Sequence, residues 1–382
     1  MQSITRRQFL KRVAGGACAL ALSRIPLEPF GGSWGGTELL ASVPELSSVE
    51  ARYYRKLPQL EVECQLCPRG CRVGDLERGF CGVRENRSGT YYTLVHSRPA
   101  ALNIDPIEKK PFFHFHPSTL AFSLGTAGCN MQCKFCQNWD LSQVRPEQVP
   151  NSYLPPEGIV SAAREASCTS IAYTYSEPVI FYEYVLDTAR LAKKKGLRSV
   201  VVTNGFIKPE PLLELCKEVD AVKVDLKGFT EAYYQEVCKG ELKPVLESLK
   251  VLKKAGVWHE IVYLVVPTLN DQEGPIRQMC RWIRQEMSAD VPVHFTRFHP
   301  MYLLKNLPPT PVRTLERSRQ IALDAGLRFV YVGNVPGHEG ENTYCPRCHK
   351  TLIRRFGYSI RETHLRKGAC QFCGEKIPGV WG

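Results

Sequence analysis

Three cysteines near the middle of the chain have a spacing that could hold a metal cluster. Cys129, Cys133 and Cys136 form a C-x3-C-x2-C motif. Thiols this close in sequence are poorly placed to bridge one another, but they can converge on one ion or cluster. A cubane iron–sulfur cluster has four irons, and ferredoxin-type sites supply one cysteine to each iron. Three cysteines therefore predict a 4Fe–4S cluster with one open iron, which could bind a small molecule and pass it an electron.

Four more cysteines precede this motif and four follow it. The first group consists of Cys64, Cys67, Cys71 and Cys81. Four thiolates suit zinc, which is slightly favoured here, but they also suit a second iron–sulfur cluster, and two disulfides are a third interpretation. The second group consists of Cys345, Cys348, Cys370 and Cys373. Its two C-x2-C pairs, 21 residues apart, are typical of a zinc ribbon. So small a piece has too little core to fold alone, so we expect it to take its stability from the metal.

Composition and charge exclude several classes of protein. The chain has 382 residues, of which 43% are hydrophobic and 23% charged, and these values exclude a disordered, fibrous or multi-span membrane protein. Its net charge is +12, but residues 1–24 contribute +5 and the segment from Cys345 onward contributes +6. The rest of the chain is almost neutral. We therefore expect no nucleic-acid-binding surface.

The N-terminus has the pattern of a targeting segment. Arg6 and Arg7, followed by the apolar run Val13–Leu22, resemble a twin-arginine export signal. The run is too short to span a bilayer, which takes about 20 helical residues. We expect a signal over residues 1–24 and a linker over residues 25–50. The rest of the chain is expected to divide into a four-cysteine module at 51–115, a barrel at 116–336 and a ribbon at 337–382.

The elements that position the central cysteines alternate between strand and helix patterns. Seven β-branched or aromatic runs predict strands at 120–124, 170–175, 199–203, 221–226, 260–266, 293–298 and 328–332. Strands separated by helices indicate a parallel sheet with right-handed crossovers. Pro178 and Gly196 suit the two ends of one helix. The pattern predicts an α/β fold, a partial (β/α)6 TIM-like barrel with the two cysteine modules before and after it.

Polar residues follow these predicted strands, where parallel sheets usually place chemistry. They include the three central cysteines, Glu177, Asn204, the Asp225-Leu226-Lys227 segment and His299. Alternation along the fourth strand places Lys223, Asp225 and Lys227 on one face. The sequence therefore predicts a site at this end of the sheet.

With Phe135 before its last cysteine, the central motif resembles that of the radical S-adenosylmethionine (SAM) superfamily. The resemblance implies that the amine and carboxylate of SAM bind the open iron. Reductive cleavage would then give methionine and a 5′-deoxyadenosyl radical that abstracts hydrogen. It also implies a low-potential electron donor of the flavodoxin or ferredoxin type.

Several residues can be carried over from the superfamily by position. Glu177 stands where the methionyl amine is bound, and Asn204 where the ribose is bound. Asp225 and Lys227 resemble the Asp-x-Lys of glycyl-radical-enzyme activases, and His299 matches a histidine on the cofactor side of those enzymes. Each also has a simpler interpretation: a helix N-terminal acid, a turn residue, a solvated strand and a loop histidine, respectively.

The flanking motifs resemble one particular group of radical enzymes. Cys64-x2-Cys-Pro-Arg-Gly-Cys71, Lys110-Pro111-Phe112-Phe113-His114-Phe115 and Arg297-Phe298-His299-Pro300 are similar to the radical enzyme of the AmmeMemoRadiSam system. Memo-type and AMMECR-domain proteins are the partners that this resemblance implies. The substrate would be a glycine of a partner protein, as in pyruvate formate-lyase activating enzymes, or a small molecule. The alternative is an exported iron–sulfur electron-transfer protein. Localisation stays open because the signal indicates export, whereas SAM chemistry is expected in the cytoplasm.

Overall fold

The computed structural model describes residues 46–382. The expected signal and most of the expected linker lie outside these residues. Among the helices of the described part, none is long and apolar enough to cross a membrane.

The central element is an eight-stranded sheet with the order β7-β8-β9-β10-β11-β12-β13-β14. Its strands are β7 (Ala101–Pro106), β8 (Leu120–Gly125), β9 (Ser170–Tyr173), β10 (Arg198–Thr203), β11 (Ala221–Asp225), β12 (Trp258–Val265), β13 (Val293–Arg297) and β14 (Val330–Gly333). Strands β8 to β14 pair in parallel, and β7 pairs antiparallel with β8. All seven predicted strands are confirmed. β7 was not predicted, and because it and β14 are the two edges of the sheet, the barrel is open.

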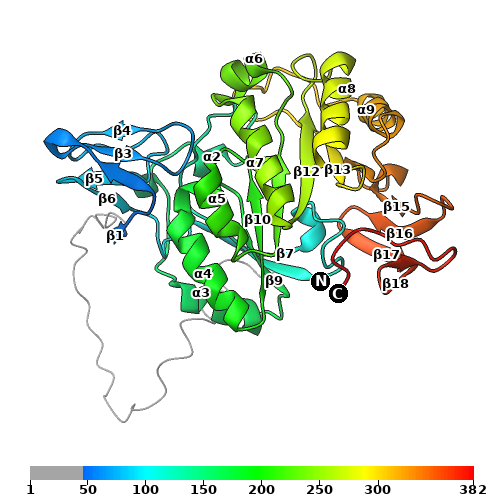
Figure 1. Cartoon of the computed structure of the whole chain (residues 1–382), viewed down its shortest axis with the longest axis horizontal. Coiled ribbons are helices and arrows are strands. Elements are labelled where there is room, and N and C mark those ends of the chain that lie inside the picture. Colours follow the sequence, from blue (N-terminus) through cyan, green and yellow to red (C-terminus); the bar gives the residue numbers. More distant parts are fainter. Residues whose placement is uncertain (1–45) are drawn as a thin grey trace, which may run out of the picture. The chain divides into compact units, whose positions relative to one another are not determined.

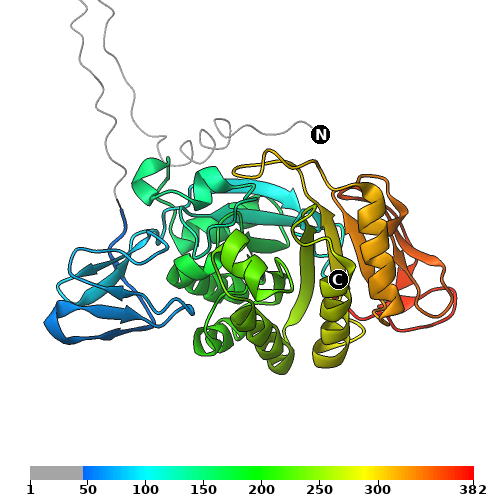
Figure 2. The same cartoon turned by 90° about the horizontal axis from the view of Figure 1, so that it is seen from above.

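Helices cover one face of this sheet (Figure 1 and Figure 2). The longer ones are α3 (Pro156–Glu165), α4 (Tyr182–Lys194), α5 (Pro209–Cys216), α7 (Leu242–Ala255), α8 (Glu273–Trp282) and α9 (Val312–Asp324). Shorter turns are α2 (Trp139–Ser142), α6 (Glu231–Tyr233), the π-helical turns η5 (Tyr234–Cys238) and η6 (Ile283–Met287), and the 3-10 turns η1 (Pro58–Leu60), η2 (Ile107–Lys109), η3 (Pro146–Gln148), η4 (Pro178–Phe181) and η7 (Glu339–Glu341). Strand and helix alternate from β8 to β14, as the sequence predicts.

The second βα unit shows how local sequence sets the ends of these elements. Pro178 begins η4, and Glu177 caps it by accepting a hydrogen bond from the backbone N–H of Val179. Helix α4 continues to Lys194, and Gly196 follows with φ +76°. A side chain would be strained in this left-handed conformation, so glycine ends the helix here as expected.

The N-terminal module consists of two small sheets. One has the order β1-β6-β5, with β1 (Val49–Glu50), β6 (Thr90–Thr93) and β5 (Arg84–Arg87). The other has the order β2-β3-β4, with β2 (Tyr54–Lys56), β3 (Val62–Cys64) and β4 (Arg72–Val73). Arg84 of β5 and Glu183 of α4 form an almost fully buried ion pair at 2.6 Å. This pair connects the N-terminal module to the barrel.

The C-terminal ribbon also consists of short strands. They are β15 (Thr343–Tyr344), β16 (Thr351–Phe356) and β17 (Ser359–Thr363) in one sheet, and β18 (Leu365–Arg366) and β19 (Ala369–Cys370) in another. Leu352 and Ile353 pack with Phe113 and Tyr331 in one hydrophobic cluster. The buried guanidinium of Arg355 donates to the carbonyl of Phe113 at 3.0 Å. The ribbon therefore shares a core with the barrel, which the sequence did not indicate. The N-terminal module (blue) and the ribbon (red) lie on opposite sides of the barrel (Figure 1).

Candidate functional site

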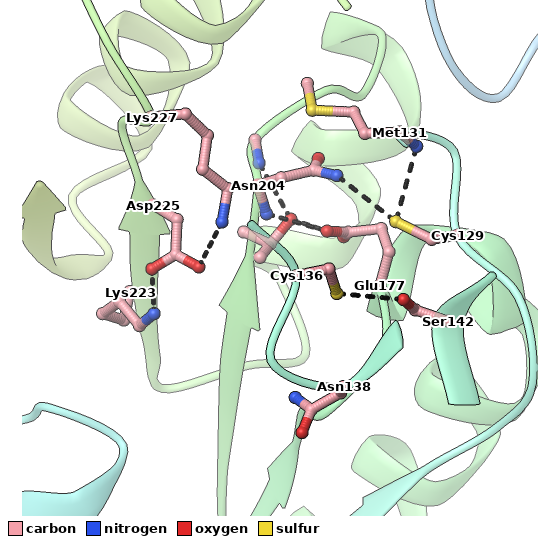
Figure 3. A network of polar contacts seen from close by, with 12 residues as sticks. Cys129, Met131, Cys136, Asn138, Ser142, Glu177, Asn204, Lys223, Asp225 and Lys227 are labelled. Atoms are coloured by element: carbon pink, nitrogen blue, oxygen red, sulfur yellow. Dashed lines mark hydrogen bonds and ion pairs between the residues drawn. The ribbon is translucent and has the colours of Figure 1, made fainter. Parts of the chain in front are cut away.

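A cavity of about 360 Å³ lies where the parallel strands end. Its lining includes Cys129, Cys133, Cys136, Glu177, Thr203, Asn204, Lys223, Asp225 and Lys227. These residues come from the loop after β8, the loop after β9, the end of β10, and β11 with its following loop. The structure thus brings together nearly all of the central-site residues named from the sequence (Figure 3).

The cysteine loop is held in place by backbone contacts. The N–H of Gln132 donates to the carbonyl of Cys238 at 3.0 Å, and the N–H of Lys134 donates to that of Val237 at 2.9 Å. Both acceptors belong to the π-helical turn η5. The loop therefore rests on an element about one hundred residues further along the chain.

Polar hydrogens lie next to two of the three thiols. The N–H of Met131 donates to Cys129 Sγ at 3.4 Å, and Ser142 Oγ lies 3.1 Å from Cys136 Sγ. Burial raises the pKa of Cys129 and of Cys136. A buried thiol with a raised pKa becomes a thiolate when a metal replaces its proton, and nearby N–H or O–H donors then stabilise the charge. The sulfurs of Cys129 and Cys136 thus have surroundings that suit metal ligands.

Glu177 is buried, and its carboxylate accepts three hydrogen bonds from residues around it. Oε1 accepts from Thr203 Oγ1 at 2.6 Å and from the N–H of Val179 at 3.1 Å, and Oε2 accepts from the N–H of Asn204 at 2.7 Å. Burial raises its pKa to about 7, although these hydrogen bonds act in the opposite direction. Glu177 therefore caps a helical turn and also lines the cavity.

Asn204 connects the end of β10 to the cysteine loop. Its Nδ2 donates to Asn130 Oδ1 at 2.9 Å and lies 3.9 Å from Cys129 Sγ. Its Oδ1 accepts from the N–H of Phe206 at 2.9 Å, a contact within its own turn. The residue is thus a turn residue that also faces the cavity.

Lys223, Asp225 and Lys227 form one charged group on the inner face of the barrel. Asp225 pairs with Lys223 through Oδ1 and with Lys227 through Oδ2, the latter at 2.8 Å. Burial alone would raise the pKa of Asp225, but the two ammonium groups lower it to about 2. Three charges with a net value of +1 therefore face the cavity. The two lysines can bind the carboxylate of a ligand, while Asp225 still presents its own carboxylate to the cavity.

His299 does not join the others. Its side chain is exposed and is not part of the cavity lining. Conversely, Thr203 and Asn130 bind site residues but were not singled out from the sequence. Neither had a sequence signal of its own, since a buried threonine and a loop asparagine occur in many proteins.

Another polar group borders the same cavity near β7. Lys110 is buried, and its ammonium pairs with Asp105 at 2.6 Å and lies 4.6 Å from the ring centroid of Tyr175. Burial lowers the pKa of Lys110 to about 8. Because β7 was not predicted, neither was this pair.

The C-terminal four cysteines form a compact group. Cys345 Sγ and Cys373 Sγ are 3.6 Å apart, and Cys348 Sγ and Cys370 Sγ are 3.7 Å apart. All four sulfurs lie within 4.8 Å of one another. A tetrahedron with metal–sulfur bonds of about 2.3 Å has edges of about 3.8 Å, so this group fits a single four-coordinate ion.

The N-terminal four cysteines are arranged differently. Cys64, Cys67, Cys71 and Cys81 all line one small cavity. They are free thiols, as are all other cysteines in residues 46–382, so the disulfide interpretation is wrong for the described structure. Within these residues, the C-terminal group alone is a cluster of three or more cysteines compact enough to hold one metal ion.

Known proteins similar to this chain share the central region. Residues 123–280 match the profile of the Radical SAM superfamily. An uncharacterized protein of Methanocaldococcus jannaschii is 46% identical over 330 residues, which are 86% of this chain and 98% of that protein. Pyruvate formate-lyase 1-activating enzyme of Escherichia coli is 25% identical over 222 residues, 53% of this chain and 89% of the enzyme. A radical SAM methyltransferase structure from Sphaerobacter thermophilus aligns with a TM-score of 0.46 and 18% identity, over 59% of this chain and 71% of that one.

Proposed function

The chain belongs to the radical SAM superfamily, and on this premise we propose that it is an activase-like radical SAM enzyme whose Cys129, Cys133 and Cys136 hold a 4Fe–4S cluster. The residues fit this group, because three thiols line one cavity and, in the described part of the chain, no fourth cysteine lines it. This observation carries the proposal, since three ligands leave one iron open. When bound, the cluster supplies the electron that cleaves SAM to methionine and a 5′-deoxyadenosyl radical for hydrogen abstraction.

The protein side chains would bind and orient SAM. Glu177 presents a carboxylate to the methionyl ammonium, and the net positive group of Lys223, Asp225 and Lys227 faces the same cavity. Asn204 lies between them and Cys129, where its amide can hold the ribose. Each role joins opposite charges or hydrogen-bond partners in a partly enclosed cavity, where such contacts are stronger than in bulk water.

The test of this proposal is a reductive cleavage assay. We expect anaerobically reconstituted protein with dithionite to convert SAM to 5′-deoxyadenosine, measured by chromatography. We also expect SAM to change the EPR signal of the reduced cluster. A fully loaded cluster that gives neither result would favour an exported iron–sulfur electron-transfer protein instead.

The relatives support a radical reaction driven by an external reductant. For the donor we propose a flavodoxin or a ferredoxin, whose potentials suit the task. We further propose that the enzyme acts in the AmmeMemoRadiSam system with Memo-type and AMMECR-domain proteins, on a protein glycine or a small molecule. The motifs at Cys64–Cys81 and Arg297–Pro300 support this assignment. Pull-down of these partners with the full chain tests it.

SAM binding should depend on pH through Glu177. Because burial raises its pKa to about 7, the carboxylate is charged above this pH and becomes neutral as the pH falls through it. We expect SAM affinity to be highest above pH 7 and to fall below it. Glu177→Gln should weaken binding at pH 8 by about tenfold or more, since a hydrogen bond to a charged group contributes about 1.5–3 kcal/mol.

Calorimetric titration of cluster-loaded protein with SAM between about pH 6 and 8 measures both effects. Glu165→Gln, an exposed acid on α3, is the matched control. If Glu177→Gln kept the affinity and pH slope of the natural protein, Glu177 would not bind the amine.

We also propose that Cys345, Cys348, Cys370 and Cys373 bind Zn²⁺. Their sulfur spacing supports a tetrahedral ion of this kind. Cys348→Ser should lower the zinc content by about one ion per chain and make the ribbon sensitive to protease, because the metal would join its two cysteine pairs. Metal analysis and limited proteolysis measure this, with Cys216→Ser on α5 as the control. An unchanged zinc content would contradict the assignment.

A further inference from the structure

The N-terminal cysteines lie against the central site. The carbonyl oxygen of Cys81 is 2.7 Å from the position that a Cβ on Gly128 would occupy, and Gly128 directly precedes Cys129. Cys81 and Cys129 also line the same cavity, which has a volume of about 740 Å³. Only a residue without a side chain allows this approach. The two cysteine groups are therefore neighbours in space.

A second contact joins the two groups through Arg69, which stands between Cys67 and Cys71 in the sequence. Its Nε donates to the carbonyl of Asn130 at 2.6 Å, and its Nη2 donates to the carbonyl of Lys239. Asn130 lies next to Cys129 in the sequence and also lines the small cavity that the four N-terminal cysteines share. One cationic side chain thus lies between two sets of thiols.

Among the described residues, only the four ribbon cysteines form a group compact enough to hold a single metal ion. The ribbon shows what a four-thiolate ion site looks like in this same structure, with all sulfurs within 4.8 Å. The N-terminal group lacks this compactness, as do the three central cysteines. Thiolates that bind different irons of one cluster lie farther apart than thiolates that share one ion. The N-terminal group therefore resembles the central group rather than the ribbon.

The charges around the N-terminal cysteines suit a negatively charged cluster. Arg84 and Arg69 line the shared cavity with the four sulfurs. Arg84 is neutralised by Glu183, with which it makes two hydrogen bonds of 2.7 and 2.6 Å. Among the described residues, Arg69 hydrogen-bonds backbone carbonyls rather than a carboxylate, and its guanidinium lies 3.4 Å from the ring centroid of Phe80. A cationic neighbour of this kind stabilises a cluster whose thiolate ligands leave it anionic.

We propose that Cys64, Cys67, Cys71 and Cys81 hold a second iron–sulfur cluster, which relays electrons to the central one. A flavodoxin- or ferredoxin-class donor is oxidised by one electron as the N-terminal cluster is reduced. The N-terminal cluster is then reoxidised as the electron passes to the central cluster. No bond to substrate forms or breaks at the N-terminal group, because all four of its irons have a cysteine ligand. The relay rests on the function proposed above, whereas the presence of the cluster does not.

Metal content tests the second cluster. Three forms of the full chain are compared after anaerobic reconstitution: the natural protein, the central variant Cys129→Ala/Cys133→Ala/Cys136→Ala, and the N-terminal variant Cys67→Ala/Cys71→Ala. We expect about eight irons per chain in the first and about four in each of the others, since each cluster would contribute four. The central variant should keep an EPR signal after reduction, and SAM should not change that signal.

Two outcomes would overturn the second cluster. One is a central variant that binds no iron. The other is an N-terminal variant that loses one zinc and no iron. Because the central variant leaves the N-terminal cysteines intact, it decides the question even where the N-terminal variant folds poorly. Cys168→Ala, a buried cysteine outside all three groups, controls for cysteine loss in general.

The relay is tested by comparing two reductants. Cleavage of SAM is measured with dithionite and with reduced flavodoxin, and the ratio of the flavodoxin-driven rate to the dithionite-driven rate is calculated for each protein. We expect this ratio to fall by about tenfold or more in the N-terminal variant relative to the natural protein. An unchanged ratio would overturn the relay. If the loaded natural protein cleaves no SAM at all, the proposed function fails, and the iron content of the central variant still decides whether the second cluster exists.

Discussion

Replacing Cys133 with alanine is expected to abolish formation of 5′-deoxyadenosine and to remove the iron of the central cluster. Cys133 is buried and lines the cavity together with the other two cysteines. Two thiolates cannot hold a cubane that leaves one iron open for SAM, so the loss should be complete rather than partial.

Cys133 also differs from its two partners in its surroundings. A hydrogen bond with the Cys238 thiol lowers the pKa of Cys133, although burial opposes this. Burial instead raises the pKa of Cys129 and Cys136. Cys133 is therefore the central cysteine whose thiol is hydrogen-bonded to another buried cysteine.

The measurement is the yield of 5′-deoxyadenosine with dithionite, together with the iron content of the same sample. Cys280→Ala, a buried cysteine of α8 far from the central loop in sequence, serves as the matched control and should retain both. Cleavage of SAM by Cys133→Ala at a rate near that of the natural protein would show that the central motif is not the cluster site.

The barrel could be predicted from sequence because its strands are buried on both faces. Val200, Val201 and Val202 of β10 form an unbroken β-branched run, Val222 and Val224 of β11 are also β-branched, and helical patterns separate such runs. β7 escaped prediction because it is an edge strand with the polar residues Asn103 and Asp105, and its antiparallel pairing needs no helix. The N-terminal strands are mostly two to four residues long, too short to show any periodicity.

The positions of site residues could be predicted where their spacing along the sequence determines which face of a strand they occupy. Alternation along β11 placed Asp225 and Lys227 on the inner face, and the structure has them there. Contacts between loops were not predictable, because the partners of Glu177 are set by how β9 and β10 pair. His299 follows β13 as expected, but position after a strand does not determine which way a side chain points.

Asp225→Asn should destabilise the fold more than any other single change at the cavity. Asp225 separates two ammonium groups, and its removal changes the net charge of this group from +1 to +2. Breaking a buried ion pair in this way costs about 3–5 kcal/mol. Because a quarter of the Asp225 side chain is exposed to the cavity, we expect a loss of about 3 kcal/mol, at the lower end of that range.

The pH dependence of this loss has a definite sign. The folded-state pKa of Asp225 is lowered to about 2, whereas an unfolded aspartate has a pKa of about 3.9. The stabilisation by the carboxylate is therefore fully present above about pH 4 and is lost as the pH falls toward 2. The difference in unfolding free energy between the natural protein and Asp225→Asn should be constant from pH 8 to about 5 and should shrink below about pH 4.

A double variant separates charge repulsion from other causes. Lys223→Met combined with Asp225→Asn returns the group to a net charge of +1, so urea unfolding should show this pair to be more stable than Asp225→Asn alone. SAM should still bind the double variant more weakly than the natural protein, because the carboxylate is gone. Equal unfolding free energies for Asp225→Asn and the natural protein would mean that the two lysines are not held together by Asp225. A group other than Asp225 would then balance the charges of the two lysines.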